Sequence, residues 1–178
     1  MRIKSFHLFL LGLCLFYSCS KEDPDHIHDH SEITHVILKI KSSNEAIQTI
    51  VWDSSEQNPE TISLKANTDY NVQISFTNES DPDAIDNITL EIIEEADVHQ
   101  VFYEFTEVSV TISSAANDTL DANGFPVLIN SVWNASTTGT GIVQAYLIHE
   151  PSDKNSTNRE GMGGFNDVSI SIPISVVD

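Results

Sequence analysis

Apolar and polar residues alternate along most of the chain from position 34 onward. The clearest case is 70–76, where every second residue, from Tyr70 to Phe76, is a large apolar one. A period of two predicts strands with one buried face. The same pattern runs through 34–41, 47–51, 62–64, 86–93, 108–112, 127–133, 141–149 and 168–176, and 101–105 is a shorter apolar run. About nine strands separated by turn residues predict an all-β fold, a single antiparallel β-sandwich that is immunoglobulin-like in the general sense.

One segment, 84–99, fits a helix as well as a strand. Ile88 and Ile92 stand four residues apart, as on one face of a helix, whereas Ile88, Leu90 and Ile92 also alternate as in a strand. The chain as a whole is rich in Thr, Val and Ile, which favour strands. We therefore expect a strand over 86–93 that is followed by a turn.

The beginning of the chain carries a different pattern. Basic residues at its start precede an apolar run over 6–17, which is shorter than the roughly 20 residues that cross a bilayer. A positive start, a short apolar run and small residues after it predict a cleaved secretory signal over 1–18. Behind it we expect a flexible acidic and His-rich tether over 19–32 and a β-sandwich domain over 33–178.

The apolar run ends at Ser18 and Cys19. A Cys directly after a small residue at this place resembles the lipobox of bacterial lipoproteins, although Phe16 stands where that family has Leu or Val. The resemblance implies that Cys19 is the lipidation site and anchors the protein in a membrane, since several acyl chains give stable anchoring. Cys14 is the competing position, but bulky Leu13 precedes it. The other alternative is an ordinary cleaved signal in which Cys19 has no role.

The tether continues with Lys21, Glu22 and Asp23. This string resembles the export signal by which some Bacteroidota-type lipoproteins reach the outer leaflet of the outer membrane. The resemblance implies lipid-anchored display at the cell surface. Retention on the periplasmic leaflet is the alternative.

Four of the seven histidines lie close together in and just after this tether: His26, His28, His30 and His35. In an extended chain the first three fall on one side. Neutral imidazoles bind zinc or copper well, so these residues are a candidate ligand set for a divalent metal. The alternative is a solvated charged tether that binds metal only incidentally.

A second candidate metal site consists of Glu95, Asp97 and His99, which share one face if the segment is extended. Carboxylate oxygens and an imidazole suit zinc or manganese. The alternative is an acidic turn before the strand at 101–105. His149 ends another predicted strand, and a site that joins it to His99 requires the two strands to meet.

The charge of the chain excludes some partners. Lys and Arg number 8 against 27 Asp and Glu, for a formal net charge of -19. Such a chain lacks the basic surface that nucleic acid requires. The sequence also contains no nucleophile elbow and no phosphate-binding loop, and we therefore expect no enzyme activity.

Three further strings carry a family resemblance. They are the acidic, His and aromatic string at 94–103, an Asp-x-Asn-Gly-x-Pro turn at 121–126 and a Gly-Gly-x-x-Asp close at 163–167. With the tether, they resemble small hypothetical outer-membrane lipoproteins of the Bacteroidota type. Lipoproteins of this type often assist a TonB-dependent outer-membrane receptor, so the resemblance implies such a partner.

Taken together, these patterns predict a non-enzymatic, ligand-binding lipoprotein of the outer membrane or cell surface. Capture of zinc or copper for uptake is the best single hypothesis for its function, because imidazoles and carboxylates gather at two places in the sequence. The alternative is a structural, adhesive or receptor-accessory surface module without a metal function.

Overall fold

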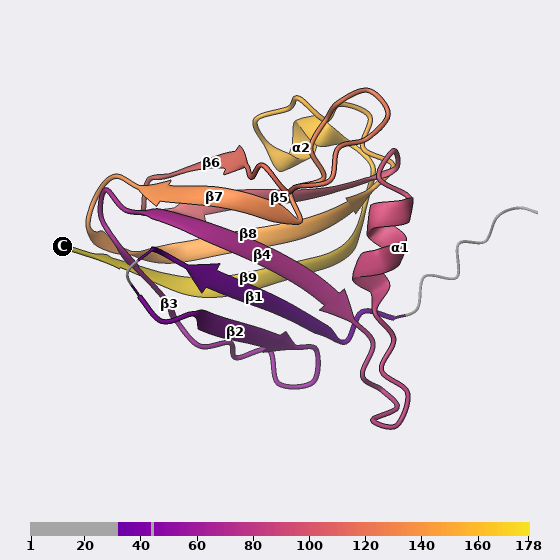
Figure 1. Ribbon diagram of the computed structural model, residues 1–178, viewed down its shortest axis with the longest axis horizontal. Coiled ribbons are helices and arrows are strands. Elements are labelled where there is room, and N and C mark those ends of the chain that lie inside the picture. Colours follow the sequence, from indigo (N-terminus) through magenta and orange to yellow (C-terminus); the bar gives the residue numbers. More distant parts are fainter. Residues whose placement is uncertain (1–31, 44) are drawn as a thin grey trace, which may run out of the picture.

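The structure, a computed structural model, describes residues 32–43 and 45–178, and this part of the chain contains nine strands and two helices. The strands form two sheets that pack face to face (Figure 1). One sheet contains, in order, β2 (Gln48–Asp53), β1 (His35–Lys41), β4 (Asp69–Thr77), β7 (Asn130–Ala135) and β6 (Val110–Ser114). The other contains, in order, β3 (Ile62–Lys65), β9 (Phe165–Val177), β8 (Gly139–His149) and β5 (His99–Thr106). The predicted all-β sandwich is confirmed.

Among these strands, neighbours pair antiparallel except β3, which runs parallel to β9. In the central pair, Leu38 of β1 lies opposite Ile74 of β4, and both side chains are buried. The inner faces of the two sheets share one core. There the ring of Trp133 packs edge-on against Tyr103 and Phe105, with centroid distances of 5.0 and 5.2 Å. Burial of these apolar side chains is the main contribution to the stability of the sandwich.

The strand predicted over 86–93 is wrong, because this segment forms the helix α1 (Ile88–Glu94). In a strand, Ile88, Leu90 and Ile92 would share one face. In the helix, Ile88 and Ile92 are each 1% exposed in the core, whereas Leu90 is 57% exposed. Ile88 and Ile92, four residues apart, lie on one face of the helix, and this face packs against the core.

Helix α1 lies across one end of the sandwich (Figure 1). Thr89 attaches it to β4, because its hydroxyl accepts a hydrogen bond from Phe76 N–H at 2.8 Å and donates one to Phe76 O at 3.1 Å. The short helix α2 (Arg159–Met162) belongs to the loop between β8 and β9. The end of the core where β5 begins and β8 ends is therefore covered by α1 and this loop.

Candidate metal centre

Two histidines lie at the same end of neighbouring strands, one at the start of β5 and one at the end of β8. β5 pairs with β8 so that His99 lies opposite His149. His99 is on the same face of β5 as Val101 and Tyr103, and it is 1% exposed. The two imidazole rings have centroids 4.8 Å apart and planes inclined by 34°. The condition for a site that joins His99 to His149, that their strands meet, is thus fulfilled by the strand register.

A β-bulge adds a carboxylate to this pair. The register between β8 and β9 shifts by one residue, and Asp167 is the residue of β9 without a partner in β8. Regular alternation from Ile170 would point Asp167 away from the core, whereas a bulge redirects such a side chain. Asp167 Oδ2 lies 3.6 Å from His99 Nε2, and Asp167 Oδ1 lies 3.7 Å from His149 Nδ1. The carboxylate therefore faces both rings.

The end of α1 holds His99 in one tautomer. His99 Nδ1 lies 3.1 Å from the carbonyl oxygen of Glu95, the residue that directly follows the helix. Because a carbonyl oxygen only accepts, Nδ1 carries the proton, and in the neutral ring Nε2 carries the lone pair. Nε2 is also the atom that faces Asp167. A backbone carbonyl that orients an imidazole in this way is typical of metal-binding histidines.

The three side chains fit a divalent metal ion. Ligand atoms of His99, His149 and Asp167 all lie within 4.8 Å of one another. Two ligands of a tetrahedral zinc ion are roughly 3.3 Å apart, so a bound ion would draw these ligand atoms closer together. Asp167 Oδ2 is buried and forms no hydrogen bond within the part of the chain that the structure describes. Two imidazoles and one carboxylate are a donor set for zinc or copper, with a fourth position left for water or another ligand.

Of the predicted group Glu95, Asp97 and His99, only His99 belongs to the cluster just described. Residues 95–98 form a turn and not an extended strand, so the three side chains do not share a face. The Glu95 carboxylate lies on the Nδ1 side of the His99 ring, 3.9 Å from that atom. The Asp97 carboxylate accepts a hydrogen bond from Ala122 N–H at 2.8 Å and so stabilises a neighbouring turn.

Asp167 is not among the metal ligands that the sequence predicted. A signal for it exists in the Gly-Gly-x-x-Asp string at 163–167, which ends on this residue. Gly164 has a φ of +64°, and a Cβ at this position would overlap the carbonyl oxygens of His149 and Glu150. The glycine therefore lets the start of β9 approach the end of β8 closely, and the acid three residues later meets His149.

The other predicted ligands lie elsewhere. His35 is at the start of β1, beside Asp53 and Glu79. The remaining tether ligands and the lipidation site lie outside the described residues and stay predictions: His26, His28, His30 and Cys19.

A buried ion pair supports the segment that leads to His99. Lys154 Nζ donates to Asp121 Oδ2 at 2.9 Å and to the carbonyl oxygen of Ala96 at 2.7 Å. The side chains of Lys154 and Asp121 are only 7% and 2% exposed. Burial raises the pKa of Asp121, but hydrogen bonds from Lys154 and from two backbone N–H groups outweigh it and hold the pKa below its usual value. The loop between β8 and β9 is thereby attached to the segment before β5.

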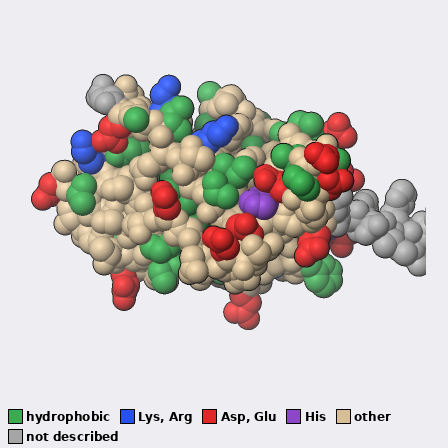
Figure 2. Space-filling view, turned by 90° about the horizontal axis from the view of Figure 1, so that it is seen from below, with side chains coloured by type: hydrophobic (Ala, Val, Ile, Leu, Met, Phe, Trp, Pro, Cys, Tyr) green, Lys and Arg blue, Asp and Glu red, His purple; other side chains and the backbone are tan. Residues whose placement is uncertain are grey.

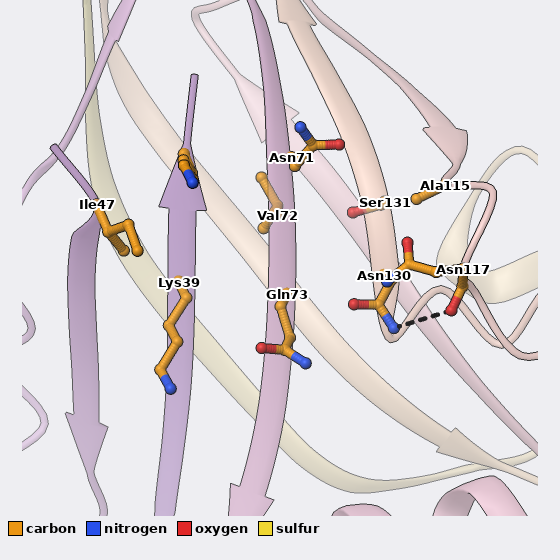
Figure 3. Close-up of a pocket in the computed structure, with 10 residues that line it drawn as sticks. Lys39, Ile47, Asn71, Val72, Gln73, Ala115, Asn117, Asn130 and Ser131 are labelled. Carbon is orange, nitrogen blue, oxygen red and sulfur yellow. Dashed lines mark hydrogen bonds between the residues drawn. The ribbon is translucent and has the colours of Figure 1, made fainter. Parts of the chain in front are cut away.

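The outer surface offers a different kind of feature. Acidic side chains are spread over the face shown in Figure 2, where an imidazole lies among them. A hollow of about 260 Å³ lies on the outer face of the five-stranded sheet, and Figure 3 shows the residues that line it. The cross-strand neighbours Lys39, Gln73 and Asn130 line it. Among the described residues, its lining contains no histidine and no carboxylate, so it suits a polar partner and not a metal.

No protein-family model matches the chain, and neither does any curated protein or solved structure. Within the described residues, no helix has the length and apolar character that crossing a bilayer requires. The geometry of His99, His149 and Asp167 is therefore the basis for a functional proposal.

Proposed function

We propose that the protein is a non-enzymatic, lipid-anchored lipoprotein of the outer membrane or cell surface that captures a divalent metal, zinc or copper, for uptake. The observation that carries this proposal is the convergence of His99, His149 and Asp167 from three strands. The formal net charge of -19 adds a long-range attraction for cations. The anchor at Cys19 and a TonB-dependent receptor as partner are parts of the proposal that rest on sequence patterns alone.

To bind at this site, a metal ion exchanges its bound water for the three side chains. His99 presents the lone pair of Nε2 toward the carboxylate, and Asp167 supplies a negative charge. The side chains of His99, His149 and Asp167 are 1%, 13% and 16% exposed, so the site is largely shielded from solvent. The attraction between the carboxylate and a cation is stronger in such surroundings than in bulk water. Three protein ligands would leave a fourth coordination position of the metal for water or another ligand.

A zinc titration by calorimetry at pH 7.5 tests the proposal. We expect one binding event of the purified protein to weaken at least about 100-fold in Asp167→Asn and in His149→Gln, since even loss of an outer-shell partner costs about 10–100-fold. Asp153→Asn is the matched control. Its carboxylate lies in the loop between β8 and β9, outside the cluster, and the charge change is the same. If Asp167→Asn binds zinc like the unchanged protein, the cluster is structural and the proposal fails.

An adhesive or receptor-accessory surface module is the second candidate function. The hollow lined by Lys39, Gln73 and Asn130 favours it, because ammonium and amide groups offer hydrogen bonds to a polar partner. Binding of receptor or glycan that persists in chelator and weakens in Gln73→Ala would support this function over metal capture.

A further inference from the structure

A second group of metal-binding residue types lies at the start of β1, in the sheet opposite the strands that carry the first cluster. β1 lies between β2 and β4, so His35 faces Asp53 on one side and Thr77 on the other. His35 Nε2 is 3.3 Å from Asp53 Oδ2 and 4.0 Å from Glu79 Oε2. Residues from three segments thus converge on one imidazole nitrogen.

Both carboxylates are oriented through their other oxygen. Asp53 Oδ1 accepts hydrogen bonds from the backbone N–H and the hydroxyl of Ser55, each at 2.7 Å. Glu79 Oε1 accepts a hydrogen bond from the Thr77 hydroxyl at 2.9 Å. These bonds leave Asp53 Oδ2 and Glu79 Oε2 on the side of His35. Such outer-shell hydrogen bonds are the usual means of orienting ligating carboxylates.

Thr34 contacts the His35 ring and the segments beside it. Thr34 Oγ1 donates its proton to Thr77 O at 3.4 Å and accepts a hydrogen bond from Glu79 N–H at 2.8 Å. Its third contact is with His35 Nδ1 at 3.0 Å. A cation bound at Nε2 would need the lone pair of that atom, and Nδ1 would then carry the proton toward Thr34.

We propose that His35, Asp53 and Glu79 form a second divalent-cation site, which is independent of the cluster at His99. One imidazole and two carboxylates suit zinc or manganese. Nε2 lies 3.3 Å from Asp53 Oδ2 and 4.0 Å from Glu79 Oε2, and two ligands of a tetrahedral zinc ion are roughly 3.3 Å apart, so Glu79 must move closer for all three to bind one ion. The three side chains are 21%, 34% and 31% exposed, so one side of the site stays open to water or to a further ligand.

His35 and the tether histidines belong to different parts of the chain. His35 is held in the sheet by β2 and β4, whereas His26, His28 and His30 precede the described residues. In the sequence, His35 is therefore close to three further imidazoles. Experiments must remove these imidazoles to observe the second site alone.

The test uses zinc as the probe, in a background variant that combines Asp167→Asn with Gln in place of the three tether histidines. We expect this background to bind one zinc ion at pH 7.5, and His35→Gln or Asp53→Asn added to it to weaken binding at least about 100-fold. Glu56→Gln, which changes an exposed acid of the neighbouring turn, is the matched control and should leave binding unchanged. Circular dichroism and thermal unfolding verify that every variant is folded.

Two results would overturn the inference. The background variant binds no zinc, or it binds zinc equally well after His35→Gln. In either case the contacts of His35 with Asp53 and Glu79 are those of an ion pair only. Because the background lacks Asp167, failure of the function proposed for the His99 cluster leaves this test unaffected. Manganese(II) gives a second measurement, since its paramagnetism should broaden the amide signals of Thr34, Asp53 and Glu79 most strongly. Broadening centred elsewhere would also contradict the site.

Discussion

His99 and His149 lie directly opposite each other at the start of β5 and the end of β8, with ring centroids 4.8 Å apart. Asp167 reaches both rings only because β9 carries a bulge at this point. A shift of one residue in either pairing would turn one of the three side chains to the other face of the sheet. The cluster is therefore a property of strand register, and backbone changes should affect it as strongly as changes of the ligands.

Zinc should stabilise the folded protein through the cluster at His99. With free zinc at 100 times the dissociation constant, the free energy of unfolding should rise by about 2.7 kcal/mol. For a domain of this size that corresponds to a melting temperature higher by roughly 5–10 °C. Thermal unfolding in a His35→Gln background measures the shift, which Asp167→Asn should abolish and Asp153→Asn should keep. An equal shift in Asp167→Asn would contradict the assignment.

Gly164 should be far less tolerant of a side chain than Gly124. Both have positive φ, +64° and +87°, but a Cβ on Gly164 would overlap two backbone oxygens, whereas one on Gly124 meets nothing within 4 Å. We expect Gly164→Ala to lower the free energy of unfolding by about 2–4 kcal/mol and Gly124→Ala by about 1 kcal/mol. Urea unfolding measures both values. Similar losses in the two variants would show that the approach of β9 to His149 is not tight.

Asp121→Asn should destabilise the protein by about 3 kcal/mol at pH 7, because it leaves the buried ammonium of Lys154 without its charge partner. The pKa of Asp121 is lowered in the folded state, so its stabilising contribution is present above the unfolded pKa of about 3.8 and is lost as the pH falls through the folded value. The difference in the free energy of unfolding between Asp121→Asn and the unchanged protein should therefore become smaller below about pH 4. Urea unfolding between pH 7 and pH 3 follows this, with exposed Asp83→Asn as control. A gap that widens on acidification would refute the role of the ion pair.

Thr89→Val should loosen α1 without changing the volume of the core. The change leaves the backbone N–H and carbonyl of Phe76 without their hydroxyl partner, which should cost about 1–3 kcal/mol. Hydrogen exchange at α1 and zinc titration should show faster exchange and weaker binding, since the carbonyl that follows α1 orients His99. Thr140→Val, at an exposed position of β8, is the isosteric control. Unchanged exchange in Thr89→Val would show that packing alone holds the helix.

The sequence pattern did not predict helix α1. The spacing of Ile88, Leu90 and Ile92 satisfies both a period of two and a helical repeat, so the local pattern contains no information that selects between them. The selection comes from the end of the sandwich, which buries Ile88 and Ile92 and leaves Leu90 exposed. The helix in turn places the carbonyl that fixes the tautomer of His99.

The sequence by itself determined the fold class. Successive side chains of a strand point to opposite faces, so alternating apolar and polar residues, as in 70–76, predict a strand with one buried face. The sequence also determined the acidic charge and which imidazoles and carboxylates the chain contains. Only the tertiary structure decided which of them meet. The first cluster joins the start of one strand to the end of a second and the bulge of a third, and the second site joins His35 to Asp53 and Glu79. These contacts depend on pairing between distant segments, and no local pattern specifies a register between strands.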